Sequence, residues 1–474
     1  CGGCFYPQDQ YQEELKEKTL FIEKEVQKAK LKIEVKPTVA SPLVNGYRNK
    51  AIVAFNQKYE YGLYEEHSQD IIPYKHCLLH EDIMDEILQY IQSYLRKYRV
   101  SIYDRKRHKG LLRHVLIRRG VKTDQTMVVL VCNENMWRGS KQFCSQLVKK
   151  FPSIKTIVLN VNTRRTPIVL GNEDKVLYGK GFIVDELCGL KFKISPQSFY
   201  QINHDQCVNL YTKALSLLNI KGNETAIDAY CGIGTIGMIL SQKVKQVIGV
   251  ESNKDAIKDA KNNARMNQLS NIQFVCDDAT EFMKKLAKER HKVDVVIMDP
   301  PRSGSTKQFM DSIKILNPKQ VVYISCDPTT QIRDIQYFKK IGYHTHTMHL
   351  YDMFPHTRHV ETVVLLSRKK PDGHINVKVE FGEGEGKVPL DNIAKRAESY
   401  KPKERVTYKM IKEYIEAKYG FKVHTAYIAE VKRDLGLPMY DTPNAVEELK
   451  QPRKHSTAEK VEAIKDALKY YKMI

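Results

Sequence analysis

The chain has 474 residues, of which 42% are hydrophobic and 28% charged, and this composition excludes a wholly disordered protein. Lys and Arg exceed Asp and Glu by 21 charges, which favours a polyanionic partner such as nucleic acid. No apolar run approaches the ~20 residues of a membrane span, so we expect no membrane association. Ten cysteines, mostly scattered singly, argue against a secreted disulfide framework and favour a cytoplasmic protein, which we expect to be a monomer.

Residues 1–200 predict an α+β domain. A charged helix is expected over 11–35, with an apolar stripe suited to packing on the domain that follows. A second helix is expected over 80–98. Between and after these helices, β-branched runs broken by turn residues predict an antiparallel sheet. The runs lie at 51–55, 111–120, 127–132, 156–161, 176–187 and 190–195.

Residues 201–370 change to a regular alternation of short apolar runs and helical stretches. This alternation is typical of a Rossmann-like α/β domain, in which a parallel sheet is wound on both faces. The expected strands lie at 225–230, 246–251, 272–276, 293–299, 320–326 and 361–367.

The last part of the chain predicts a linker and a small helical domain. Residues 371–404 are rich in Gly, Pro and Lys, as linkers are. Residues 405–474 predict a helix, a turn at Gly420 and a further helix opening at Thr425, which resembles a helix-turn-helix module. Its tyrosines and lysines suit RNA contacts, but they fit an aromatic core with solvated lysines equally well.

A glycine-rich turn follows the first strand of the α/β domain. Gly232, Gly234 and Gly237 have the G-x-G-x-x-G spacing, which lets a ligand approach the backbone at a helix N-terminus. Both nicotinamide enzymes and methyltransferases use such turns, so the turn alone does not decide between them.

Acidic residues at three further strand ends favour methyl transfer. Glu251 is placed to bind ribose hydroxyls, Asp278 to accept from an adenine amino group, and Asp299 lies at the same carboxyl edge. Together they suit S-adenosylmethionine, which is cationic at sulfur. The alternative is that each acidic residue only caps the helix after its strand.

Cys326 and Glu361 supply the chemistry that a pyrimidine methylation needs. Cys326 ends the strand at 320–326 and Glu361 begins the last strand, so both are expected near the working edge. Addition of a thiolate to C6 of a pyrimidine makes C5 nucleophilic, and a base must then remove the C5 proton. His356 or Arg358 could keep the thiolate ionised. The alternative for Cys326 is a buried structural cysteine.

At this point the sequence resembles the RNA uracil-C5 methyltransferases over roughly residues 1–368. The motifs that carry the resemblance are SFYQIN, DAYCGIGTIG, GVES, DPPR, SCDP and FPHTRHVET. The resemblance implies that Cys326 is the nucleophile and Glu361 the proton-abstracting base. It also implies a set of residues that bind S-adenosylmethionine: Gln201, Tyr230, Glu251, Asp278 and Asp299.

The cysteines near the N-terminus resemble those of the subgroup that acts on 23S ribosomal RNA. Cys1, Cys4 and the distant Cys77 match three ligands of the [4Fe–4S] cluster of that subgroup. The fourth cysteine is missing from this sequence, as is the small RNA-binding domain common in the family, and we expect the chain to be truncated. Zinc is an alternative, because His76 and His80 flank Cys77.

The sequence therefore predicts an S-adenosylmethionine-dependent methyltransferase that acts on uracil C5 in 23S ribosomal RNA through a covalent cysteine adduct. Methylation of the T-loop uridine of tRNA by the same chemistry is the alternative. A Rossmann oxidoreductase is a more distant alternative, since it would leave Cys326 and Glu361 unexplained.

Overall fold

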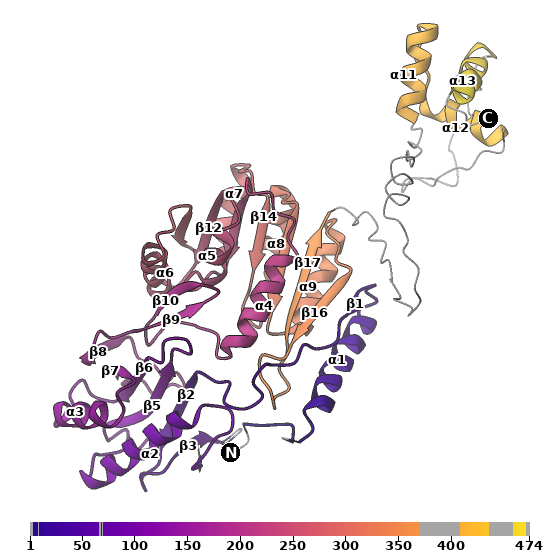
Figure 1. The fold of residues 1–474 in the computed structure, drawn as a ribbon. Helices are drawn as coiled ribbons and strands as arrows, with labels where there is room; N and C mark the ends of the chain where they lie inside the picture. Colours follow the sequence, from indigo (N-terminus) through magenta and orange to yellow (C-terminus); the bar gives the residue numbers. More distant parts are fainter. Residues whose placement is uncertain are drawn as a thin grey trace, which may run out of the picture. The chain divides into compact units, whose positions relative to one another are not determined.

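A computed structural model of the chain describes residues 3–7, 9–65, 68, 70–368, 408–435 and 458–470. The chain divides into two compact units, Cys1–Ile375 and Asn376–Ile474 (Figure 1). No helix in these described ranges is long and apolar enough to cross a membrane.

The larger unit contains an eight-stranded sheet among its described residues, in the order β1-β16-β17-β15-β14-β11-β12-β13. All paired strands run parallel except β17, which lies antiparallel between β16 and β15. The strand order reverses between β11 and β14, and ligands of open α/β sheets bind at such a reversal. The strands are β1 (Glu34–Val35), β11 (Thr225–Ala229), β12 (Gln246–Glu251), β13 (Ile272–Cys276), β14 (Val295–Met298), β15 (Gln320–Ser325), β16 (Thr347–Tyr351) and β17 (Glu361–Ser367).

Helices flank this sheet (Figure 1). They are α1 (Tyr11–Lys28), α4 (His204–Ser216), α5 (Thr235–Ser241), α6 (Lys254–Met266), α7 (Ala279–Lys288), α8 (Lys307–Leu316) and α9 (Pro328–Lys340). The helix expected over 11–35 is shorter than predicted. It ends at Lys28, Lys30 takes a left-handed backbone with φ 53°, and residues 34–35 form β1 beside β16.

A second sheet lies before the eight-stranded one in the chain. Its seven described strands have the order β4-β3-β2-β5-β6-β7-β8. It is antiparallel as expected except between β6 and β7, which are parallel because α3 crosses over between them. The elements are β2 (Lys50–Phe55), β3 (Tyr61–Tyr64), β4 (Ile71–Pro73), β5 (Leu112–Arg119), β6 (Thr126–Cys132), β7 (Ile154–Val161), β8 (Glu173–Gly179), α2 (Asp82–Lys97) and α3 (Ser140–Lys150).

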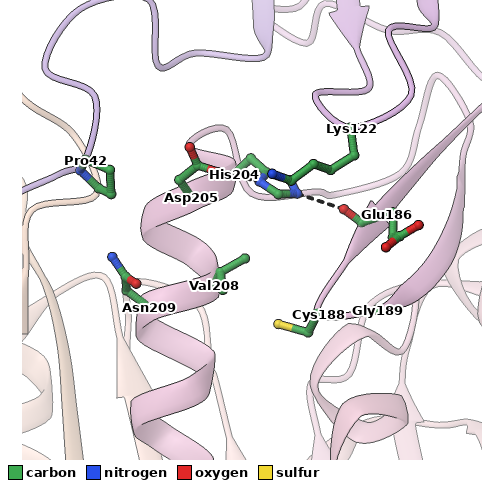
Figure 2. A pocket seen from close by; sticks show the side chains of 9 residues that line it. All are labelled: Pro42, Lys122, Glu186, Cys188, Gly189, His204, Asp205, Val208 and Asn209. Carbon is green, nitrogen blue, oxygen red and sulfur yellow. Dashed lines mark hydrogen bonds and ion pairs between the residues drawn. The ribbon is translucent and has the colours of Figure 1, made fainter.

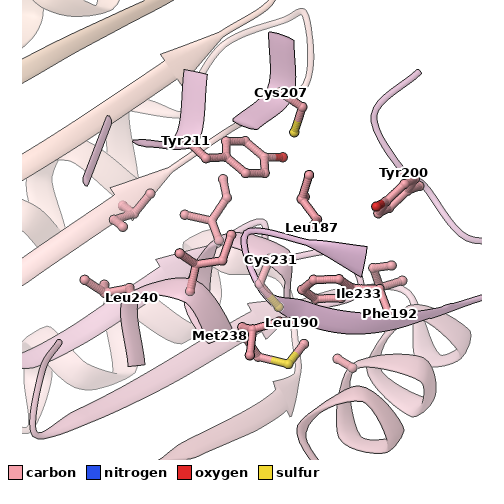
Figure 3. Packing of buried hydrophobic residues seen from close by; sticks show 14 of the residues in the cluster. Leu187, Leu190, Phe192, Tyr200, Cys207, Tyr211, Cys231, Ile233, Met238 and Leu240 are labelled. Carbon is pink, nitrogen blue, oxygen red and sulfur yellow. The ribbon is translucent and has the colours of Figure 1, made fainter. Parts of the chain in front are cut away.

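A hairpin of β9 (Ile183–Leu187) and β10 (Leu190–Ile194) connects the two sheets. Figure 3 shows its Leu187 and Phe192 in the cluster that also contains Tyr211 of α4 and Met238 of α5. The same buried cluster includes Val129 of the seven-stranded sheet and strands of the eight-stranded sheet. One hydrophobic cluster therefore extends across both sheets, and each sheet has a further cluster of its own.

The smaller unit has three described helices, α11 (Tyr408–Tyr419), α12 (Thr425–Asp434) and α13 (Ala458–Tyr470), with a core of their own. Gly420 ends α11 with a left-handed backbone, φ 74°. Tyr408, Tyr414 and Tyr427 pack against this core, whereas Tyr419 is 40% exposed. Most of these tyrosines thus follow the core alternative. The linker expected at 371–404 lies outside the described residues.

Candidate active site

The glycine turn connects β11 to α5 and brings a helix N-terminus to the switch point of the sheet. Gly234 is the N-cap of α5 with φ 85°, a backbone conformation that favours glycine. A Cβ at Gly237 would lie 2.7 Å from Asp228 Oδ2, the same oxygen that accepts the Gly237 N–H at 2.7 Å. The first turn of α5 therefore packs on the Asp228 carboxylate, and there is no room there for a side chain at position 237.

Four of the five residues expected to bind the methyl donor lie beside this turn or at neighbouring strand ends, and the fifth, Gln201, lies before α4. Glu251 Oε2 accepts the Gly232 N–H at 3.2 Å, which fixes the carboxylate beside the turn. Tyr230 ends the β11 segment with φ 65°, and its ring centroid is 5.6 Å from that of Phe309. Gln201 lies just before α4, and its carbonyl oxygen accepts from Asn49 Nδ2 at 2.9 Å.

Asp278 behaves as the helix-capping alternative describes. Its Oδ1 accepts the N–H groups of Thr280 and Glu281 at 2.9 and 3.1 Å, at the N-terminus of α7. Capping occupies one oxygen of the carboxylate. The side chain is exposed at the carboxyl edge, so the prediction that it contacts a ligand remains open to test.

Sheet register brings Cys326 and Glu361 together. Ser325 of β15 pairs with Thr362 of β17 in an antiparallel ladder. Cys326 follows Ser325 and Glu361 precedes Thr362, so the two residues oppose one another at the end of the ladder. Asp299 follows β14, the neighbour of β15, at the same edge.

These side chains form one electrostatic group. Burial, followed by Asp299, raises the pKa of Glu361 above its ordinary value. Burial also raises the pKa of Asp299. Burial and then the carboxylates of Glu361 and Asp299 raise the pKa of Cys326 to about 11. The cysteine is therefore held as a thiol at neutral pH, beside carboxyl groups that resist ionisation.

Arg302 supplies the positive charge that the sequence had assigned to His356 or Arg358. It opposes the rise in pKa at both Cys326 and Glu361. His356 is buried, which lowers its pKa and favours the neutral ring. The Arg358 guanidinium lies 3.6 Å from the centroid of the Phe5 ring. The expectation for these two residues is therefore corrected.

Three residues of the site were not singled out from the sequence: Asp228, Arg302 and Tyr211. Burial raises the pKa of Asp228 to about 7, and Asp299 and Glu251 add to the rise. Asp228 and Arg302 both stand inside quoted motifs, DAYCGIGTIG and DPPR, so the signal was present. Tyr211 of α4 is buried, its pKa is raised by burial and then by Cys207 and Asp299, and nothing in its local sequence marks it.

The expected cluster cysteines are only partly described. Cys1 lies outside the described residues. Desolvation, and then the charge of Cys77, raise the pKa of Cys4. Burial would raise the pKa of Cys77, but a hydrogen bond and charge from His80 lower it. Among the described residues, no group of three or more His, Cys, Asp or Glu could hold a metal ion.

A cavity of about 510 Å³ opens beside the N-terminus of α4 (Figure 2). His204 lies in its wall, with Nε2 2.7 Å from the carbonyl oxygen of Glu186. The cavity is lined by Pro42, Lys122, Glu186, Cys188, Gly189, His204, Asp205, Val208 and Asn209. None of the predicted site residues is among them, so it is separate from the Cys326 site.

A mostly parallel sheet with a glycine turn and polar strand ends at its switch point defines the Rossmann-like α/β class of methyltransferases and dehydrogenases. Residues 10–369 match the family described as tRNA (Uracil-5-)-methyltransferase, and the chain belongs to this family. It is therefore an RNA (uracil-5-)-methyltransferase. The oxidoreductase alternative loses its support.

Similar proteins include two bacterial relatives named as uncharacterized RNA methyltransferases. That of Caldanaerobacter subterraneus subsp. tengcongensis is 37% identical over 78% of this chain and 82% of its own length. That of Lactobacillus johnsonii is 40% identical over 71% of this chain and 75% of its own. Among solved structures, the Pyrococcus abyssi tRNA (uracil-54, C5)-methyltransferase in complex with S-adenosyl-L-homocysteine is 28% identical. Its TM-score is 0.63, and the match covers 75% of this chain and 83% of that one.

Proposed function

We propose that the chain methylates C5 of a uracil in RNA through a covalent intermediate on Cys326. The observation that carries the proposal is the position of Cys326 opposite Glu361 at the end of the β15–β17 ladder. A nucleophile and a base held on adjacent strands can reach C6 and C5 of one pyrimidine ring, which are bonded neighbours.

In this mechanism the Cys326 thiol first loses its proton to solvent. The thiolate then adds to C6 of the uracil, and C5 becomes an enolate carbon. C5 then forms a bond to the methyl group, which S-adenosylmethionine supplies. C5 now carries both the methyl group and its original proton. Glu361 takes that proton, the electron pair restores the C5–C6 double bond, and the C6–S bond breaks to release the Cys326 thiolate.

S-Adenosylmethionine would lie at the glycine turn, where Glu251 faces the Gly232 N–H. We assign its binding to Gln201, Tyr230, Glu251, Asp278 and Asp299. The Pyrococcus structure holds S-adenosyl-L-homocysteine, the product of such a transfer, which supports this choice of donor. A sulfonium ion near Asp299 would also favour the ionised form of that buried carboxyl.

Two substitutions test the assignment. Cys326→Ala removes the nucleophile, so 5-methyluridine and any covalent protein–RNA species should both disappear while S-adenosylmethionine still binds. Glu361→Gln blocks only the last step, so a methylated, denaturant-resistant protein–RNA adduct should accumulate. Cys276→Ser, at an exposed cysteine, is the matched control. Sustained 5-methyluridine formation by Cys326→Ala would refute the covalent mechanism.

We further propose 23S ribosomal RNA as the substrate. Support comes from the Cys-Gly-Gly-Cys start and Cys77, which resemble the ribosomal subgroup. The tRNA alternative has the support of the Pyrococcus enzyme, whose name states that it acts on uracil 54 of tRNA. Mass mapping of 5-methyluridine after incubation with 23S RNA or tRNA decides between them. Methylation of tRNA alone would reject the ribosomal proposal.

We also propose that Cys1, Cys4 and Cys77 are ligands of a [4Fe–4S] cluster. The interaction between the Cys4 and Cys77 thiols fits two ligands of one centre. A cluster normally takes four ligands, and the described residues do not complete such a set, so no catalytic step depends on it here. After anaerobic reconstitution, iron and sulfide content should fall in Cys4→Ser and Cys77→Ser but not in Cys276→Ser. Equal iron in all three variants would reject this assignment.

A further inference from the structure

The loop between β16 and β17, residues 352–360, leads directly into Glu361. Much of its backbone is bound by residues from the first fifty positions of the chain. The N–H groups of Phe5 and Tyr6 donate to the His356 carbonyl at 2.6 and 3.2 Å. Tyr47 Oη donates to the Pro355 carbonyl at 3.1 Å. The N-terminal segment therefore holds the loop that delivers the proposed base.

Three charges from α1 and this loop form the centre of the contact. Lys18 Nζ donates to Glu14 Oε1 at 2.6 Å, to Asp352 Oδ1 at 2.7 Å and to the Phe354 carbonyl at 3.4 Å. Glu14 in turn accepts the His356 N–H, at 2.9 Å through Oε1 and at 3.1 Å through Oε2. The Lys18 side chain is 1% exposed and both carboxylates are 0% exposed.

Such a buried ion cluster is poorly explained by stability alone. Desolvation of the charges offsets much of their attraction, and apolar side chains of similar volume often stabilise as well or better. What charges add is direction, because each hydrogen bond fixes an orientation. Here, every bond of Lys18 and Glu14 outside their own helix ends on the loop.

The helix that carries these charges is itself firmly placed. Ile22 and Val26, on the same face as Lys18 because of their spacing, are buried in the core with Phe309 and Phe338. Beyond the helix, β1 pairs with β16, the strand that leads into the loop (Figure 1). The first half of the loop, residues 352–356, is thus held by the segment that contains α1 and β1.

We infer that Glu14 and Lys18, together with Asp352, are positioning residues that hold the loop 352–360 and through it set the carboxylate of Glu361 for removal of the C5 proton. This inference rests on the proposed role of Glu361. It predicts a selective effect, because the hydrogen bonds that Lys18 and Glu14 make outside α1 end on the loop, and none ends on Cys326 or on the glycine turn. Loss of the contacts of Glu14 and Lys18 with the loop should slow removal of the C5 proton more than the addition of Cys326 or the methyl transfer.

The test compares Lys18→Met with Lys16→Met, an exposed lysine on the same helix that pairs with Glu13. In Lys18→Met, kcat should fall about tenfold, part of the ~10²–10⁴-fold that a general base provides. The methylated protein–RNA adduct should accumulate during turnover, and affinity for S-adenosylmethionine should stay within about twofold of wild type. Lys18→Arg, which keeps the charge and donors, should restore part of the rate.

Glu14→Gln is a second, milder variant of the same contact. It leaves Lys18 and Asp352 as an ion pair with no net charge, so it should fold even if Lys18→Met does not. It should show a smaller rise in adduct. Hydrogen exchange gives a readout independent of activity: loop amides should exchange about tenfold faster in Lys18→Met than in Lys16→Met. If Lys18→Met and Glu14→Gln show the exchange and adduct levels of Lys16→Met, the inference is wrong. If the loop amides exchange faster in Lys18→Met but wild type forms no adduct, the proposed covalent function is wrong, while the role of Lys18 in holding the loop is supported.

Discussion

At the scale of single residues, the cluster of Cys326, Glu361, Asp299 and Arg302 places acidic groups where burial opposes their ionisation. The raised pKa of Glu361 means that the protonated form is favoured in the folded protein. A base with a raised pKa is a stronger proton acceptor once it is ionised, as removal of a C5 proton requires. Because of the same burial, ionisation of this carboxyl group lowers the free energy of unfolding of the protein.

This loss of stability on ionisation gives a pH-dependent prediction for Glu361→Gln. A raised folded-state pKa contributes stability below the unfolded value of about 4.5, and that contribution is lost as pH rises through the folded value. Gln stays neutral, so the variant should gain thermal stability relative to wild type as pH rises. The melting temperature of the variant should exceed that of wild type by a small amount at about pH 5 and by a larger amount at about pH 9. Exposed Glu281→Gln should show no such trend, and a difference independent of pH would contradict the prediction.

Arg302 gives a second prediction at this scale. It opposes the rise in the pKa of Cys326, so Arg302→Met should raise that pKa further. Each unit of rise leaves about tenfold less thiolate at a given pH. Alkylation of Cys326, followed by peptide mass spectrometry, should therefore slow by about threefold to tenfold. Lys319→Met, just before the opposite end of β15, is the control and should leave the rate unchanged. Equal rates in both variants would assign the charge effect to another group.

The sequence was sufficient to place these residues at one edge but not to describe their charges. Strand ends of a parallel sheet share an edge, so Cys326, Glu361 and Asp299 could be grouped from spacing and motif. Which cation serves Cys326 depends on side-chain contacts between loops, and local sequence pointed to His356 and Arg358. Burial of His356 against α1 and stacking of Arg358 on Phe5 are long-range contacts that no local pattern reveals.

At the scale of secondary-structure elements, the β11–α5 turn depends on the absence of a side chain at Gly237. In Gly237→Ala, the new Cβ would meet Asp228 Oδ2 at 2.7 Å, and the carboxylate would have to give up its bond to the backbone. The start of α5 should then shift, and affinity for S-adenosylmethionine should fall about tenfold or more, as measured by calorimetric titration. Gln242→Ala, at the exposed C-cap of α5, should bind like wild type. Unchanged affinity in Gly237→Ala would show that the turn does not contact the donor.

The elements themselves were predicted unevenly. The α/β alternation predicted six of the eight described strands of the larger sheet, each of them a short apolar run, but β1 and β16 were not predicted. The expected helix over 11–35 ran too far, since its periodicity carries no sign that residues 34–35 pair with a strand more than 300 residues later. The parallel β6–β7 pair was also missed, because α3 was not recognised as a crossover helix.

At the scale of the whole molecule, the two compact units have separate hydrophobic cores. A chain that ends at Ile375 should therefore fold and keep the wild-type affinity for S-adenosylmethionine. Its main thermal transition should match that of the full chain within a degree or two. Loss of folding on this truncation would show that the unit after Ile375 is needed for stability of the first.

The pairing of α1 and β1 with the end of the catalytic sheet has a consequence for synthesis of the protein. Roughly 320 residues separate α1 from β16, and ribosomes add about 5–20 residues per second. For about 15 seconds to a minute, then, the nascent chain carries α1 without the Asp352 partner of Lys18 and β1 without its partner strand β16. Helix α1 therefore leaves the ribosome long before β16 and the loop 352–360, and during that interval it is available to chaperones that bind emerging chains.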